Sequence, residues 1–99
     1  MIKEKFLQAR QSKHKVRITF YSEAERQTHM RTCVPLDYGP GKGTKAQLDQ
    51  FHVWENESVS GGHLLSLDPE QVRRLDILDE VFDPADFVWF LSRDWGQHV

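Results

Sequence analysis

The sequence predicts a mainly β fold, a small five-stranded antiparallel barrel of the SH3-like or Sm-like kind, with a helix at each end. Five extended segments follow one another with hairpin-like spacing, and helical spacing of apolar residues occurs only near the termini. We therefore expect a single domain over residues 1–99. It should have an N-terminal helix at about 2–11, the barrel at about 15–82 and a C-terminal helix at about 84–92.

Two apolar periodicities define the first two elements. Ile2, Phe6 and Ala9 are spaced i, i+4 and i+7, which places them on one face of a helix. From Val16 to Phe20, apolar and polar residues alternate, as they do in a half-buried strand. The chain therefore changes from helix to strand between these segments.

The second strand is expected from Thr28 to Val34 and should end at Pro35, which cannot donate a hydrogen bond to a neighbouring strand. Alternation divides its side chains between two faces. We expect the inward face to carry Met30, Thr32 and Val34, and the opposite face to carry His29, Arg31 and Cys33.

The glycine-rich segment from Gly39 to Lys45 is expected to be a flexible surface loop. It differs from a phosphate-binding P-loop because Lys42 is followed by Gly43, where that motif needs Ser or Thr and then a helix. A third strand, Leu48 to Glu55, should follow the loop. Nucleotide hydrolysis by this loop is therefore not expected.

Two helix-entrance signals organise the last third of the chain. Asp68, Pro69 and Gln71 form a capping pattern after the apolar strand 64–67, which predicts a one-turn helix near 69–72. A further strand should follow and run to about residue 82. Asp83 and Pro84 repeat the entrance signal and begin the C-terminal helix.

Composition limits the class of protein. Ninety-nine residues form one domain, and a hydrophobic content of 38% indicates a thin core that relies on its aromatic residues. Cys33 is the only cysteine, which excludes an internal disulfide and a cysteine-rich metal site. The sequence has no apolar run of the ~18 residues that a membrane span needs. We expect a cytoplasmic protein with no membrane association and no cofactor.

The net charge of −2 conceals an asymmetry. Residues 1–50 carry ten Lys/Arg and five Asp/Glu, whereas residues 51–99 carry three and ten, so the halves have charges of +5 and −7. One interpretation is that the halves neutralise each other in the fold. The other is a basic face for an anionic partner such as nucleic acid, built from Lys3, Lys5, Arg10, Lys13, Lys15 and Arg17.

The order of several short motifs resembles the WYL domain, over about Val16 to Phe87. The motifs are Val16-Arg17-Ile18-Thr19-Phe20-Tyr21, Arg31-Thr32-Cys33-Val34-Pro35-Leu36, Phe51-His52-Val53-Trp54, Leu65-Ser66-Leu67-Asp68 and Leu75-Asp76-Ile77-Leu78. The closest likeness is to short stand-alone bacterial proteins of this type. The resemblance implies an SH3-like or Sm-like barrel that senses a ligand or nucleic acid in transcription or defence regulation, without enzymatic activity.

The family pattern is altered at several positions. The naming tripeptide corresponds to Phe51-His52-Val53, so His52 occupies the tyrosine position, and Ser66 and Pro69 stand where arginines flank the Leu-Asp pair. Arg31 keeps a family arginine. The resemblance, together with the chemistry of these side chains, predicts a ligand-binding set of Arg31, His52, Arg73, Arg74, His29 and Tyr21.

Each of these residues also has an ordinary explanation. Arg31 beside His29 and Cys33 forms either an anion-binding face or a surface salt bridge. His52 and His63 could join His29 and Cys33 around a metal, but their spacing matches no ligand motif. No Ser-His-Asp or Cys-His arrangement is recognisable, so we expect no catalytic residue and no metal.

The C-terminal segment 87–91 is apolar on all sides of a helix, whereas a helix lying on a barrel needs one apolar stripe. We expect the extra surface to contact a second copy of the chain or a protein partner. The residues assigned to that contact are Phe87, Trp89, Phe90 and Trp95.

The sequence thus supports three functions. The first is a WYL-type regulatory module that binds an anionic small molecule and acts with a separately encoded partner. The second is a nucleic-acid-binding barrel that uses the basic first half and stacks bases on Tyr21, Tyr38 or Trp54. The third is a protein-interaction domain that works through its terminal helix.

Overall fold

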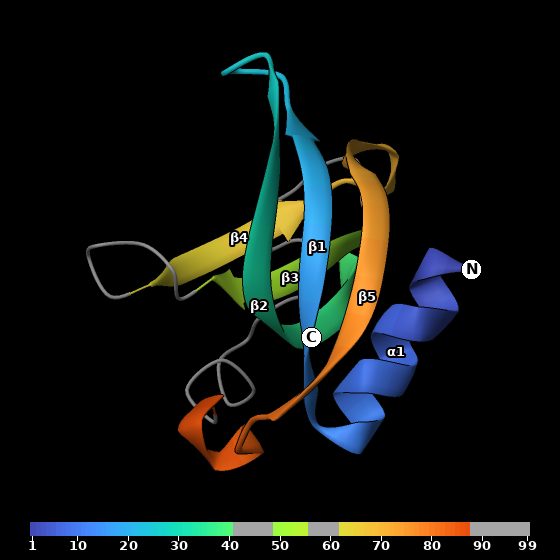
Figure 1. Ribbon diagram of the computed structural model, residues 1–99, viewed down its shortest axis with the longest axis vertical. Coiled ribbons are helices and arrows are strands. Elements are labelled where there is room, and N and C mark those ends of the chain that lie inside the picture. Colours follow the sequence, from blue (N-terminus) through green and yellow to red (C-terminus); the bar gives the residue numbers. More distant parts are fainter. Residues whose placement is uncertain (41–48, 56–61, 88–99) are drawn as a thin grey trace.

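A computed structural model describes residues 1–40, 49–55 and 62–87 (Figure 1). The expected loop 39–45 lies largely outside these residues, as do most of the residues of the expected C-terminal helix. In chain order the elements are α1 (Ile2–Ser12), β1 (His14–Ser22), β2 (Gln27–Pro40), β3 (Asp49–Glu55), β4 (His63–Leu67), η1 (Pro69–Gln71), β5 (Val72–Val81) and η2 (Pro84–Phe87).

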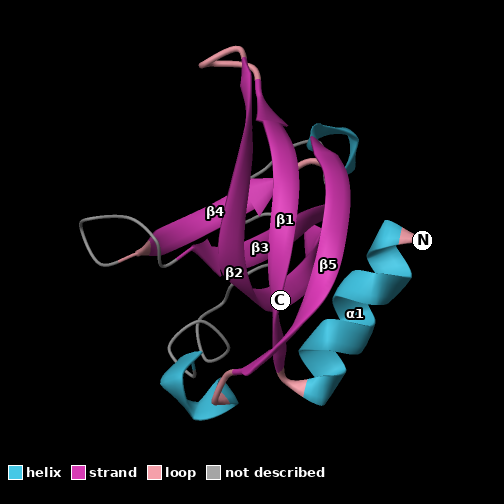
Figure 2. Cartoon of the chain, in the orientation of Figure 1, coloured by secondary structure: helices cyan, strands magenta, loops and turns pink. Residues whose placement is uncertain are grey.

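The five strands form one antiparallel sheet in the order β4-β3-β2-β1-β5, which confirms the mainly β class and the strand number (Figure 2). The long β2 changes direction along its length, so β3 and β4 run across the direction of β1 and β5 (Figure 1). The sheet is curled but not closed, because β4 and β5 remain its two edges in the described part of the chain. The expected barrel is therefore not confirmed.

Helix α1 packs against β1, β2 and β5 through one face, as its apolar spacing predicts. Phe6 and Ala9 are fully buried, and the Phe6 ring meets the edge of Phe51 with a centroid distance of 4.9 Å. The helix ends at Lys13, which adopts the left-handed conformation with φ of 65°. The N-terminal helix is thus confirmed, and the main core lies between it and the sheet.

The expected orientation of β2 is wrong. Cys33 is fully buried in the main core, whereas Met30 is 56% exposed, so His29, Arg31 and Cys33 face inward. The register explains this, because His29 lies opposite Phe20 and Cys33 lies opposite Val16, both of which are core residues. The prediction of the inward face was wrong because Val34, although apolar, is buried in a second apolar cluster on the other face of the sheet.

The expected end of the strand at Pro35 is also wrong, since β2 continues to Pro40. Pairing with β3 shifts between Pro35 and Asp37, and a bulge at this point accommodates a residue that cannot donate a hydrogen bond. The bulge keeps Leu36 buried in the second cluster beside Val34.

The two helix-entrance signals are confirmed as caps of single 3-10 turns. In η1, the Gln71 side chain accepts from the Asp68 backbone N–H at 2.9 Å and donates to the Tyr21 carbonyl at 3.0 Å. In η2, the Asp83 carboxylate accepts from the Ala85 N–H at 3.0 Å. The predicted helix over 84–92 is described only as far as this turn, so a C-terminal α-helix is not shown.

Candidate functional site

A cleft of about 560 Å³ opens at the edge of the main core, beside the hairpin that joins β1 to β2. We call it the Arg31 cleft. Its walls combine two apolar side chains with five ionisable ones and a hydroxyl. The lining residues are Phe20, Ser22, Glu25, His29, Arg31, Glu55, His63 and Leu65.

Strand register brings these residues together. Phe20 of β1 lies opposite His29 of β2, and their rings are 5.6 Å apart. On the other side, Glu55 of β3 lies opposite both Cys33 and His63. Directly paired residues share a face of a sheet, so the lining residues of β1 to β4 continue the core face outward.

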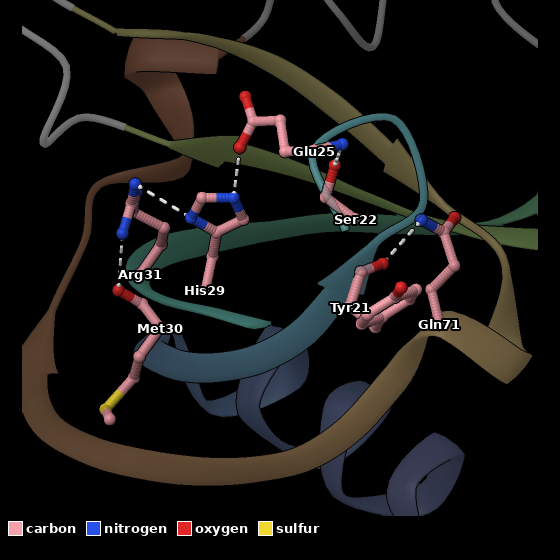
Figure 3. A network of polar contacts seen from close by, with 7 residues as sticks. All are labelled: Tyr21, Ser22, Glu25, His29, Met30, Arg31 and Gln71. Atoms are coloured by element: carbon pink, nitrogen blue, oxygen red, sulfur yellow. Dashed lines mark hydrogen bonds and ion pairs between the residues drawn. The ribbon is translucent and has the colours of Figure 1, made fainter. Parts of the chain in front are cut away.

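A chain of polar contacts runs from the hairpin into the cleft (Figure 3). Nε2 of His29 lies 2.5 Å from Oε1 of Glu25, and Nδ1 of the same ring lies 3.3 Å from Nη2 of Arg31. Nη1 of Arg31 donates to the carbonyl of Met30 at 3.0 Å. The guanidinium is thus held by two acceptors, and the imidazole by one partner at each nitrogen.

These partners define the histidine tautomer. A guanidinium only donates, so Nδ1 of His29 must accept from Arg31. Nε2 therefore carries the hydrogen and donates it to the Glu25 carboxylate. In this state the ring orients Arg31, and its lone pair points at the guanidinium and not at a hydroxyl.

Glu55 lines the cleft from the neighbouring strand β3. The residue is 2% exposed, and its Oε1 lies 3.4 Å from Nδ1 of His63, whose side chain is 51% exposed. Burying a carboxylate is costly unless it is paired or hydrogen-bonded. The contact with His63 reduces this cost, and Glu55 and Arg31 line the same cleft from neighbouring strands.

His52 lies apart from this cleft. It is fully buried, its Nε2 lies 2.9 Å from the carbonyl of Gly39, and its Nδ1 lies 2.8 Å from Oγ of Ser66. The carbonyl can only accept, so Nε2 donates and Nδ1 accepts from the hydroxyl. These contacts give His52 a packing role between β2, β3 and β4.

The other predicted ligand-binding residues also lie elsewhere. Tyr21 points away from the cleft, and its ring lies 5.7 Å from the guanidinium carbon of Arg73. Arg74 is exposed and contacts Asp76 at 3.0 Å. Of the six residues predicted to bind ligand, the structure thus places His29 and Arg31 in the Arg31 cleft, and Tyr21 and Arg73 beside each other outside it.

Most residues of the predicted basic face make contacts within the chain. Lys5 and Arg10 donate to the backbone carbonyls of Leu75 and Leu36, at 3.3 and 2.6 Å. Lys15 pairs with Glu80 at 2.7 Å, a contact between the basic and the acidic half. Lys3 lies over the Tyr38 ring, and Arg17 is exposed. The charge asymmetry is partly neutralised inside the fold.

The alternative of a metal site formed by the histidines and Cys33 has no support in the geometry of the described residues. In residues 1–40, 49–55 and 62–87, no group of three or more His, Cys, Asp or Glu side chains is arranged to hold a metal ion. Cys33 lies in the main core, and the two ring nitrogens of His52 contact Ser66 and Gly39.

Among the aromatics expected to contact a partner, Phe87 is described. It packs within the chain, with ring centroids 6.3 Å from Trp54 and 6.2 Å from Phe82. Trp89, Phe90 and Trp95 lie outside the described residues. Phe87 helps to cover the second apolar cluster, which contains Val34 and Leu36.

Sequence reasoning did not select Glu25 or Glu55 for this site. A signal for Glu55 was available, because it ends the alternating series Phe51, Val53, Glu55 on the buried face of β3. Glu25 gave no such signal, since its position depends on the shape of the hairpin turn.

The chain matches no family model, curated protein or solved structure. No helix in the described residues is both long and apolar enough to cross a bilayer.

Proposed function

We propose that this chain is a non-enzymatic binding module that holds a small molecule with an anionic group in the Arg31 cleft. One observation carries this proposal: Arg31 is half-buried in a cleft of about 560 Å³ and is fixed there by His29 and by the Met30 carbonyl. A guanidinium has five N–H donors in a planar fork that suits a carboxylate or phosphate. The two described contacts use two of these donors.

The arrangement around His29 favours binding over acid–base catalysis. A general base needs a lone pair directed at the proton that it removes. In His29 the lone pair on Nδ1 faces Arg31, and the N–H on Nε2 faces Glu25. Ser22 lies in the same cleft, but its hydroxyl oxygen accepts from the Glu25 backbone N–H at 3.4 Å. We assign His29 and Glu25 to positioning Arg31.

The resemblance to WYL domains supports a regulatory use of this binding. On that basis the module acts with a separately encoded partner, which responds to occupancy of the cleft. The resemblance rests on motif order along β1 to β5, and Arg31 is the residue that both the family pattern and the cleft select.

The test is an NMR titration of the ¹⁵N-labelled protein with 4-methylbenzoate, which offers a carboxylate to Arg31 and a ring to Phe20 and Leu65. We expect saturable shifts of residues that line the Arg31 cleft. The neutral isostere 4-methylbenzamide should bind about tenfold more weakly, because a charge-assisted hydrogen bond is lost. Equal binding of the two compounds, or shifts centred on Tyr21 and Arg73, would contradict the proposal.

A further inference from the structure

Besides Arg31, the Arg31 cleft contains charged groups that an anion bound to Arg31 would not contact. Its acidic residues are Glu25 and Glu55, its permanent cation is Arg31, and its histidines are His29 and His63. With both histidines neutral, the cleft has a net charge of −1. An anionic ligand would therefore enter a site whose remaining charge opposes it.

The two opposite charges lie on one face of the sheet at a defined separation. Cys33 pairs directly with Glu55, and Arg31 precedes Cys33 by two residues on β2. With a rise of about 3.3 Å per residue and a strand spacing of about 4.8 Å, the Cα atoms of Arg31 and Glu55 are roughly 8 Å apart. The same cleft contains the apolar side chains of Phe20 and Leu65.

Glu55 lines the cleft beside His63, so a ligand group that contacts the Glu55 carboxylate would take the place of the His63 imidazole. The Glu55 carboxylate is almost fully buried, and its described partner His63 is half-exposed at the cleft. An ammonium or amidinium group that takes this place could approach the Glu55 oxygens from the cleft side. A cation there would form a charge-assisted hydrogen bond in a site sheltered from water.

We propose that the ligand of this cleft is zwitterionic, with its anionic group on Arg31, its cationic group on Glu55 and an apolar body between them. This inference rests on the proposed function, since it assigns the second half of the ligand for the same cleft. It disfavours ligands with several negative charges, such as nucleotides, because Glu55 would repel the additional charge.

The experiment compares 4-(aminomethyl)benzoate with 4-methylbenzoate and benzylamine in NMR titrations of the whole chain. The zwitterion should bind at least about tenfold more tightly than either singly charged compound, since one charge-assisted contact is worth about that factor. The isosteric variant Glu55→Gln should weaken binding of the zwitterion and strengthen binding of 4-methylbenzoate. The control Glu80→Gln removes a carboxylate that pairs with Lys15 and should change neither affinity.

The outcomes separate this inference from the proposed function. If 4-methylbenzoate binds as tightly as the zwitterion in the unmodified protein, the zwitterion inference is overturned and the anion site stands. If Glu55→Gln lowers both affinities equally, Glu55 is structural and the inference is likewise overturned. If none of the three compounds binds, both proposals are overturned. If Glu55→Gln does not fold, the affinities of the three compounds for the unmodified protein still test the zwitterion inference.

Discussion

Arg31 and His29 are held in a fixed relation, with Nη2 of the guanidinium 3.3 Å from Nδ1 of the imidazole, on the inward face of β2. Because Glu25 accepts the hydrogen on the opposite ring nitrogen, the turn of the β1–β2 hairpin is connected to the orientation of Arg31. This chain of contacts makes His29 a positioning residue for the proposed anion site.

Two substitutions of His29 should separate its two contacts. The Oδ1 of Asn lies near the position of the histidine Nδ1 and can accept from Arg31, whereas the Nε2 of Gln lies near the histidine Nε2 and can donate to Glu25. We expect His29→Asn to keep most of the affinity for 4-methylbenzoate and His29→Gln to lose about fivefold, equivalent to one hydrogen bond of ~1 kcal/mol. The reverse order in the titrations would show that the contact to Glu25 dominates.

The packing of α1 is tested by a matched pair of helix variants. Phe6 is fully buried against Phe51, so Phe6→Ala should lower the free energy of unfolding by about 3–5 kcal/mol. Leu7 is its exposed neighbour, and Leu7→Ala should cost less than about 0.5 kcal/mol. Urea denaturation measures both values, and similar losses at the two positions would disprove the observed helix orientation.

A matched pair of glycine variants tests the entry into β4. Gly62 has φ of 110°, and an added Cβ would lie 2.8 Å from Nε1 of Trp54 and 2.9 Å from the Glu55 carbonyl. We expect Gly62→Ala to destabilise the fold by about 2 kcal/mol or more, because backbone strain and a steric clash act together. At Gly39 an added Cβ would make an ordinary van der Waals contact, 3.9 Å from Oδ2 of Asp37, so Gly39→Ala should be nearly neutral. Equal thermal stability of the two variants would rule out the described conformation of Gly62.

His52 should affect stability and not ligand affinity. Its replacement by Ala removes contacts to Ser66 and to the buried carbonyl of Gly39, with an expected cost of about 2–4 kcal/mol. The folded fraction should still bind 4-methylbenzoate with unchanged affinity, because His52 does not line the Arg31 cleft. A selective loss of binding, with normal stability, would restore His52 to the ligand-binding set.

Local patterns in the sequence were sufficient for the mainly β class, the five-stranded antiparallel sheet and the N-terminal helix. The spacing of Phe6 and Ala9 predicted the helix face, and the Asp68–Gln71 pattern predicted the capped turn, because both depend on neighbours in sequence. The face of β2 was assigned wrongly because Val34 is buried on the side away from the main core. Burial on both faces removes the alternation on which such assignments depend.

The candidate site was predicted only in part, because local patterns identify neighbours on one strand but not neighbours from other strands. Arg31 and His29 are two residues apart on one strand, so alternation alone places them together. Their neighbours Glu55 and His63 come from other strands, and only the register between β2, β3 and β4 brings them into the cleft. That register depends on the bulge after Pro35, where the sequence pattern had suggested the end of the strand.

The most direct test of the account is the affinity of 4-methylbenzoate for Arg31→Gln beside the control Arg74→Gln, measured by NMR titration. Arg74 is exposed and paired with Asp76 away from the cleft, so its loss removes the same charge without touching the site. We predict a loss of about tenfold or more for Arg31→Gln and an unchanged affinity for Arg74→Gln. Equal affinities for the two variants would contradict the assignment of Arg31 as the anion-binding residue.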